Sequence, residues 1–242
     1  MIRNKKASHV GMILSFVIFI TFTVFIYSVV SPSIDNPESK RTLLNEIGLK
    51  LITNMSSDFT SLSIQINNNQ EENCIQLQNL ILLISRDIDY FNKLVAKNEE
   101  GNVQYAYGNF SNLKIDRQNS DNVFFKVYFS PEFSSIGETT KSCVLISEPG
   151  YKIGSVFSGK YIFEKNMYWL VDYYNSNYEK LKSELRISPG DEFGFEFILS
   201  NGTRIIAVEE LPTQNIYAED IPVQYIDDEA NILSGFINVK VW

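Results

Sequence analysis

The chain has 242 residues, among them 21 Lys and Arg, 29 Asp and Glu, one His and two Cys. A hydrophobic fraction of 44% and a charged fraction of 21% argue against a collagen, a coiled coil or a wholly disordered chain. The formal net charge of −8 argues against nucleic acid as a partner, because a polyanion is bound through clustered Lys and Arg.

The N-terminal region predicts a membrane helix. Residues 10–30 carry no charged side chain, and Arg3, Lys5 and Lys6 precede them. At about 1.5 Å per residue this stretch spans about 30 Å as a helix, the thickness of a bilayer core. We expect a basic cytoplasmic leader at 1–9, a transmembrane helix at 10–30 in contact with membrane lipid, and an extracellular remainder. A cleaved signal peptide is one alternative, although its apolar stretch is normally only about 7–15 residues long. A buried core helix is the other and has less support, because such helices rarely run this long without a charge.

Small residues recur at every fourth position at the start of this segment, at Ala7, Gly11 and Ser15. Such a ridge lets the backbones of two membrane helices approach closely, so it predicts self-association or packing against related subunits. Chance is the competing explanation, since small residues are common in membrane helices.

The run KKASHVG at residues 5–11, followed by MILSFVIFI, resembles the start of archaeal type IV pilin-like precursors, which carry a class III signal peptide. This resemblance implies a short leader removed by a dedicated peptidase, and a helix that anchors the subunit and can later pack in a filament core. The stretch at 215–242 also resembles the ends of uncharacterised archaeal surface proteins with this kind of N-terminus. Gly11 stands where the family carries a Glu, which favours an anchored protein that does not polymerise.

Residues 31–57 predict a polar, Pro-containing joint followed by a juxtamembrane amphipathic helix. Apolar residues fall at helical spacing between Glu38 and about Met55, namely Leu43, Leu44, Ile47, Leu51 and Ile52.

Residues 58–242 predict one exported α+β domain with a mostly antiparallel sheet. A second amphipathic helix is expected around Tyr174–Leu185, ending before the Pro-Gly pair at 189–190. Residues 74–84 are apolar and fit either a strand or a helix. Strands are expected at 59–66, 94–97, 103–107, 113–115, 123–129, 142–146, 152–157, 192–199, 204–208, 221–226 and 233–241.

Two features agree with export. Cys74 and Cys143 are the two cysteines, and in an oxidising compartment they are expected to form a disulfide; two buried free thiols are the alternative. Asn54, Asn109 and Asn201 each begin an Asn-X-Ser/Thr triplet and are candidate N-glycosylation acceptors, although three such triplets are near chance for this composition. Asn201, at an expected hairpin tip, fits a glycan best.

The sequence offers little for catalysis. The single histidine, His9, lies at the start of the apolar segment, so no Ser–His–Asp or Cys–His arrangement is expected outside. Two separated cysteines do not make a zinc site, and no phosphate-binding glycine motif is present. The acidic stretches at 116–121 and 227–229 lack EF-hand spacing and fit solvated turns. We therefore expect no catalytic residue, no metal ion and no cofactor.

Four tyrosines at 168, 173, 174 and 178 could line a sugar- or protein-binding face, but the helical spacing of Tyr174 and Tyr178 indicates that these two face the core. Three hypotheses follow. The first is a pilin-like structural or adhesive surface subunit, and the second is a tethered extracellular binding module. An exported hydrolase is the third and has the least support, since no catalytic constellation is visible.

Overall fold

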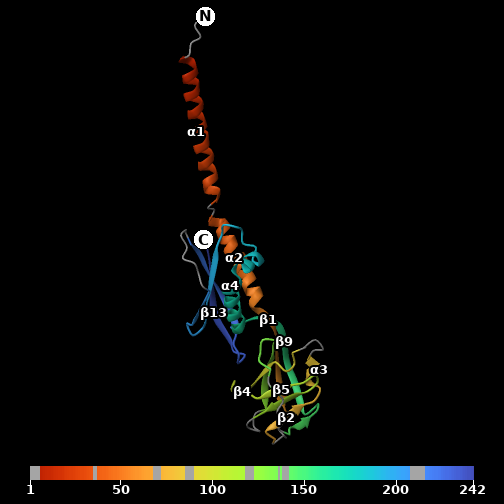
Figure 1. Cartoon of the computed structure of the whole chain (residues 1–242). Coiled ribbons are helices and arrows are strands. Elements are labelled where there is room, and N and C mark those ends of the chain that lie inside the picture. The colour runs from red at the N-terminus through yellow and green to blue at the C-terminus, as the bar shows by residue number, and fades with distance from the viewer. Residues whose placement is uncertain are drawn as a thin grey trace.

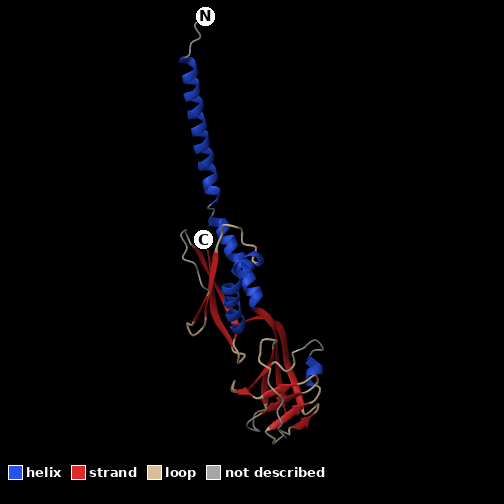
Figure 2. Ribbon diagram, in the orientation of Figure 1, coloured by secondary structure: helices blue, strands red, loops and turns tan. Residues whose placement is uncertain are grey.

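The computed structural model describes residues 6–34, 37–67, 72–84, 90–117, 123–135, 137, 142–207 and 216–242. The fold is α+β, with one long helix projecting from a head that has two halves (Figure 1). Most helical residues lie in the half next to the projecting helix, and the other half is made almost entirely of strands (Figure 2).

The projecting helix is α1, Lys6–Ile34. Every side chain from Gly11 to Ser28 is exposed. Within the described part of the chain it is the one helix that is long and apolar enough to cross a membrane, and a signal sequence would have the same properties. The N-terminal apolar helix is therefore confirmed, while its membrane crossing remains a prediction.

Two helix–strand units run through the head. The helix α2, Pro37–Met55, continues directly into the strand β1, Ser56–Ile66. The strand β9, Tyr151–Phe163, continues directly into the helix α4, Glu164–Glu184. Because β1 and β9 pair as antiparallel neighbours and α2 contacts α4, the two units lie side by side and connect the halves (Figure 1).

The proximal half, which is next to α1, consists of α2, α4 and four antiparallel strands. Alternation in the first of these strands turns Phe193, Phe195 and Phe197 toward the helices, where they join a core with Leu51 and Leu170. These strands are β10 Phe193–Ile198, β11 Arg204–Ile206, β12 Tyr217–Ile226 and β13 Ile232–Val241.

The distal half is a sandwich around a second core, which includes Leu62, Ile75 and Phe125. One sheet extends β1 with β7 Phe124–Phe129, β3 Leu94–Asn98 and β4 Val103–Gln104. The other sheet contains β5 Ala106–Gly108, β6 Leu113–Asp116, β2 Cys74–Leu77 and β8 Val144–Ile146, with the short helix α3 Leu80–Ile84 following β2.

The halves share a sheet and a small aromatic cluster. Within the described residues the larger sheet has the order β11-β10-β13-β12-β9-β1-β7-β3-β4. Its two parts meet where β12 runs parallel to β9, at Ile162 and Phe163. Phe59, Phe133 and Phe163 pack there against residues of β12 and its turn.

The mostly antiparallel α+β architecture is confirmed, and among the described strands two pairings are parallel, β9 with β12 and β2 with β8. The ambiguous residues 74–84 form both a strand and a helix. The expected strand at 103–107 divides at Tyr105, so that β4 joins one sheet and β5 the other. Helix α4 begins earlier than its spacing indicated and has a non-helical residue at Asn177.

Candidate functional site

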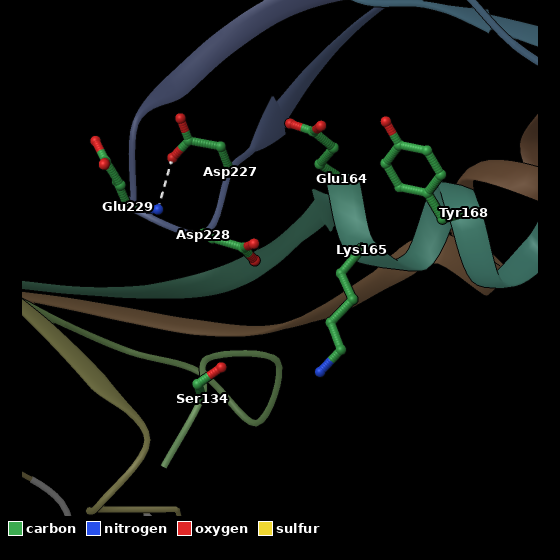
Figure 3. Close-up of a pocket in the computed structure, with 7 residues that line it drawn as sticks. All are labelled: Ser134, Glu164, Lys165, Tyr168, Asp227, Asp228 and Glu229. Atoms are coloured by element: carbon green, nitrogen blue, oxygen red, sulfur yellow. Dashed lines mark hydrogen bonds between the residues drawn. The ribbon is translucent and has the colours of Figure 1, made fainter. Parts of the chain in front are cut away.

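A cleft of about 440 Å³ opens where the turn between β12 and β13 meets the start of α4 (Figure 3). Four carboxylates and one lysine give it a negative charge. Its lining residues are Ser134, Glu164, Lys165, Tyr168, Asp227, Asp228 and Glu229.

The turn is held in place by its first residue. Oδ1 of Asp227 accepts hydrogen bonds from the N–H of Glu229 at 3.0 Å and of Asn231 at 2.8 Å. Ala230 adopts a left-handed backbone with φ of 60° and is buried in the aromatic cluster between the halves. The turn is thus fixed at the junction, with Asp228 and Glu229 at the cleft (Figure 3).

Glu164 comes from the other side of the cleft, as the first residue of α4. Burial raises the pKa of its carboxyl, and the charges of Asp227 and Asp228 raise it further. Lys165 donates from Nζ to the carbonyl oxygen of Glu132 at 3.3 Å. The cleft is suited to attract a cationic group, but among the described residues no three His, Cys, Asp or Glu side chains are placed to hold a metal ion.

A second cleft, of about 510 Å³, lies along the same turn and is lined by β3, β7 and β13. Lys97 donates from Nζ to Oδ1 of Asn231 at 2.6 Å, and Asn231 in turn donates from Nδ2 to Oδ2 of Asp227 at 2.8 Å. Burial lowers the pKa of Lys97, while the charges of Asp227 and Glu229 oppose that shift. This chain of hydrogen bonds ties the distal half to the proximal half.

A third cleft, of about 380 Å³, lies where α4 meets the end of α2. The rings of Trp169 and Tyr173 stack with centroids 5.3 Å apart, and Nζ of Lys180 lies 5.7 Å from the centroid of Tyr173. The hydroxyl of Tyr173 donates to Glu184 at 3.2 Å, and Trp169 remains 52% exposed. The structure thus presents a flat aromatic surface beside Asn54.

The expected site residues are distributed over the whole molecule. Cys74 and Cys143 form a disulfide that ties β2 to the segment before β8. Gly11 and Ser15 are exposed on α1, which also contains Ala7.

The glycosylation candidates differ in their surroundings. Asn54 is exposed in the last turn of α2, and Asn201 is exposed in the turn between β10 and β11. Asn109 is half-buried, and its Oδ1 accepts hydrogen bonds from the N–H groups of Ser111 and Asn112. Glycosylation of any of them remains a prediction.

As their helical spacing indicated, Tyr174 and Tyr178 face the core. Tyr174 is buried, and its hydroxyl donates to the carbonyl oxygen of Phe193 at 2.8 Å. Tyr178 packs against the same core, whereas Tyr168 is exposed at the acidic cleft. Of the acidic stretch at 116–121, Asp116 lies in β6, Arg117 follows it, and 118–121 lie outside the described residues.

Sequence reasoning missed Glu164, Lys97 and Trp169 as site residues. Glu164 and Lys97 acquire their neighbours from distant parts of the chain, as Lys97 does from Asn231. Trp169 stacks on Tyr173 one helical turn away, so the i, i+4 spacing of two aromatic residues was the available signal. No protein-family model, curated protein or solved structure matches this chain. Function is therefore inferred from the residues and their arrangement.

Proposed function

We propose that this chain is a membrane-anchored surface protein that displays its two-part head outside the cell. The observation that carries the proposal is the complete exposure of α1 from Gly11 to Ser28, next to a head with cores of its own. An apolar helix of this length is stable when lipid or other apolar helices cover it. The basic residues before it favour a cytoplasmic N-terminus.

The disulfide supports the outward orientation of the head. Cys74 and Cys143 are 69 residues apart and are joined in the distal half. Such bonds persist in oxidising compartments and are rare in the cytosol. Together with the charge bias, this favours an extracellular head.

Within this class, the leading proposal is a pilin-like structural or adhesive subunit. The resemblance of the N-terminus to pilin-like precursors supports it, as does the exposure of Gly11 and Ser15 on α1. A membrane helix with such a ridge can pack closely against copies of itself. Adhesion would then use the surface of the head.

A tethered binding module that never polymerises is the second candidate. Gly11, where the pilin-like family carries a Glu, favours it. So do the three clefts in the proximal half and at the junction, because concave surfaces with polar linings are where ligands bind.

Intact mass and N-terminal sequencing of the protein from its native membrane test the proposal. Recovery in the membrane fraction, with a head that external protease digests in intact cells, is the expected result. Loss of residues 1–6 or 1–7 would support the pilin-like subunit, and an intact Met1 would support the tethered module. A soluble protein cut after residue 30 would overturn both, because it would identify α1 as a cleaved signal sequence.

A further inference from the structure

The outer edge of β9 is the longest unpaired backbone edge in the described part of the chain. The strands that end the two sheets, β11, β4, β5 and β8, have only two or three residues each. In contrast, β9 pairs with β1 along its length but with β12 only at Ile162 and Phe163. One side of residues 151–161 is therefore open.

Alternation in the ladder identifies the free groups on this edge. Ile66 donates its N–H to Val123, away from β9, whereas Asn67 donates to Gly150, on the β9 side. Because successive residues of a strand direct their backbone groups to opposite sides, Leu62 and Thr60 also face away from β9. Their antiparallel partners on β9 then point outward. Val156 is the partner of Leu62, and Ser158 is the partner of Thr60. Lys160, two residues further along β9, points outward as well.

Edge strands are usually protected by charges, by proline, by β-bulges or by being short. A β-bulge interrupts β9 at Gly154 and Ser155, where its register against β1 shifts, and the strand is regular from Val156 onward. The free edge of β12 carries Pro222 with Glu219 and Asp220. Residues 153–159 of β9, with the sequence IGSVFSG, contain neither a charge nor a proline. Residues 154–158 are all exposed, Val156 by 45% and Phe157 by 52%.

A second copy of the chain fits this edge poorly. A two-fold pairing centred on Val156 would put the β-bulge at Gly154 and Ser155 inside the ladder of both copies, where it interrupts regular pairing. Since β9 runs roughly along the long axis of the molecule, such a pair would also direct the two α1 helices to opposite ends (Figure 1). Two copies anchored in one membrane by α1 cannot adopt this arrangement. This exclusion rests on the proposed function, in which α1 is a membrane anchor.

We propose that the outer edge of β9 binds an extended segment of another polypeptide by strand addition. Backbone hydrogen bonds to Val156, Ser158 and Lys160 provide the affinity, as in other cases of β-augmentation. Lys152 and Lys160, both exposed, flank the uncharged stretch. A regular strand of about 3.3 Å per residue would place them about 26 Å apart, and the β-bulge between them makes the distance shorter. The partner is therefore uncharged over the centre and acidic at both ends. Asp58 lies opposite Lys160 on β1, so the acidic end next to Lys152 contributes more.

The test uses the full chain in detergent and the nonapeptide Asp-Thr-Val-Thr-Val-Thr-Val-Thr-Asp as probe. In the free protein, the amides of Val156, Ser158 and Lys160 should exchange with solvent quickly, while those of Phe157 and Gly159, which face β1, exchange slowly. The peptide should protect the first set and leave the second unchanged. No saturable protection up to about 1 mM peptide, or an edge already protected in the free protein, would overturn the proposal.

Matched variants separate strand addition from other binding. Ser158→Pro removes an outward N–H and should weaken peptide binding about tenfold or more, whereas Ser158→Ala, which keeps the N–H, should leave it unchanged. A peptide N-methylated at alternate residues should fail to bind, and one with Lys at both ends should bind more weakly. Unaltered slow exchange at Phe157 and Gly159 in Ser158→Pro shows that the strand is intact. If the N-methylated peptide bound as tightly as the unmodified peptide, the proposal would be contradicted. Measuring how much of each sample partitions into membranes tests the proposed anchoring by α1 separately.

Discussion

The helices α1 and α2 follow one another in the chain but differ in where their apolar side chains go. In α1 every residue from Gly11 to Ser28 is exposed, whereas in α2 Leu44, Ile47 and Leu51 are buried against the strands of the proximal half. Apolar surface is stable only when it is removed from water. The head supplies that cover for α2 and not for α1, so α1 requires lipid or other helices.

Deleting residues 1–34 should give the largest effect. We expect the truncated head to leave the membrane fraction completely and to keep its disulfide and its cooperative unfolding, because both cores lie outside α1. Fractionation with near-UV circular dichroism checks both parts. A truncated head that stays with the membrane would show that some other surface of the head binds it.

A matched pair of leucines sharpens the comparison. Leu51 in α2 is fully buried, and Leu14 in α1 is 60% exposed. Leu51→Ala should lower the free energy of unfolding of the head by about 2–5 kcal/mol, since it leaves a cavity in the core. Leu14→Ala should leave head unfolding unchanged. Urea titration of both full-length variants in the same detergent measures this, and equal effects would contradict the division between the two helices.

A matched pair of glycines gives a smaller effect. A Cβ added at Gly48 in α2 would overlap Cδ1 of Ile221, while nothing lies near Gly11 in α1. Gly48→Leu should cost about 1–3 kcal/mol, because the added side chain overpacks a buried position and the side chain of Ile221 must move. Gly11→Leu should leave the head untouched and weaken association of α1 with other helices.

Urea unfolding and cross-linking in native membranes separate the two glycine variants. An unchanged cross-linking pattern in Gly11→Leu would indicate that the small-residue ridge is due to chance.

Local patterns account for what the sequence predicted well. The predicted ends of α1 and α2 lie within a few residues of the observed ends, because each helix has a continuous pattern. This pattern is apolar throughout in α1 and apolar at helical spacing in α2. The pairing of Cys74 with Cys143 followed from their being the two cysteines. These inferences needed no knowledge of which strands become neighbours.

The first two clefts depend on such neighbours and were not predictable, whereas most residues of the third lie on α4 alone. Glu164 meets Asp227 because β9 leads directly into α4 where the turn between β12 and β13 arrives. Strand propensity marked β9 but gave no indication that most of its outer edge stays unpaired. Similarly, 103–107 has one continuous strand pattern, and only the positions of the two sheets explain why it divides at Tyr105.

The smallest expected effect concerns pH. Residues 10–34 contain no Asp, Glu, Lys, Arg or His, so membrane association should not change between pH 7 and pH 3.

In the proximal half, Glu192 has a lowered pKa. Its burial acts to raise the pKa, but this effect is outweighed by hydrogen bonds from Lys182, at 2.6 Å, and from Tyr178, together with the positive charge of Lys182. A lowered carboxyl pKa stabilises the folded head above the unfolded value of about 4.3, and this contribution is lost as the pH falls through the folded value. In Glu192→Gln, the urea midpoint of unfolding should therefore fall less steeply with decreasing pH below about pH 4.5, and membrane partition should not change. If the midpoint fell as steeply as in the unaltered protein, other carboxylates would be responsible for the acid sensitivity.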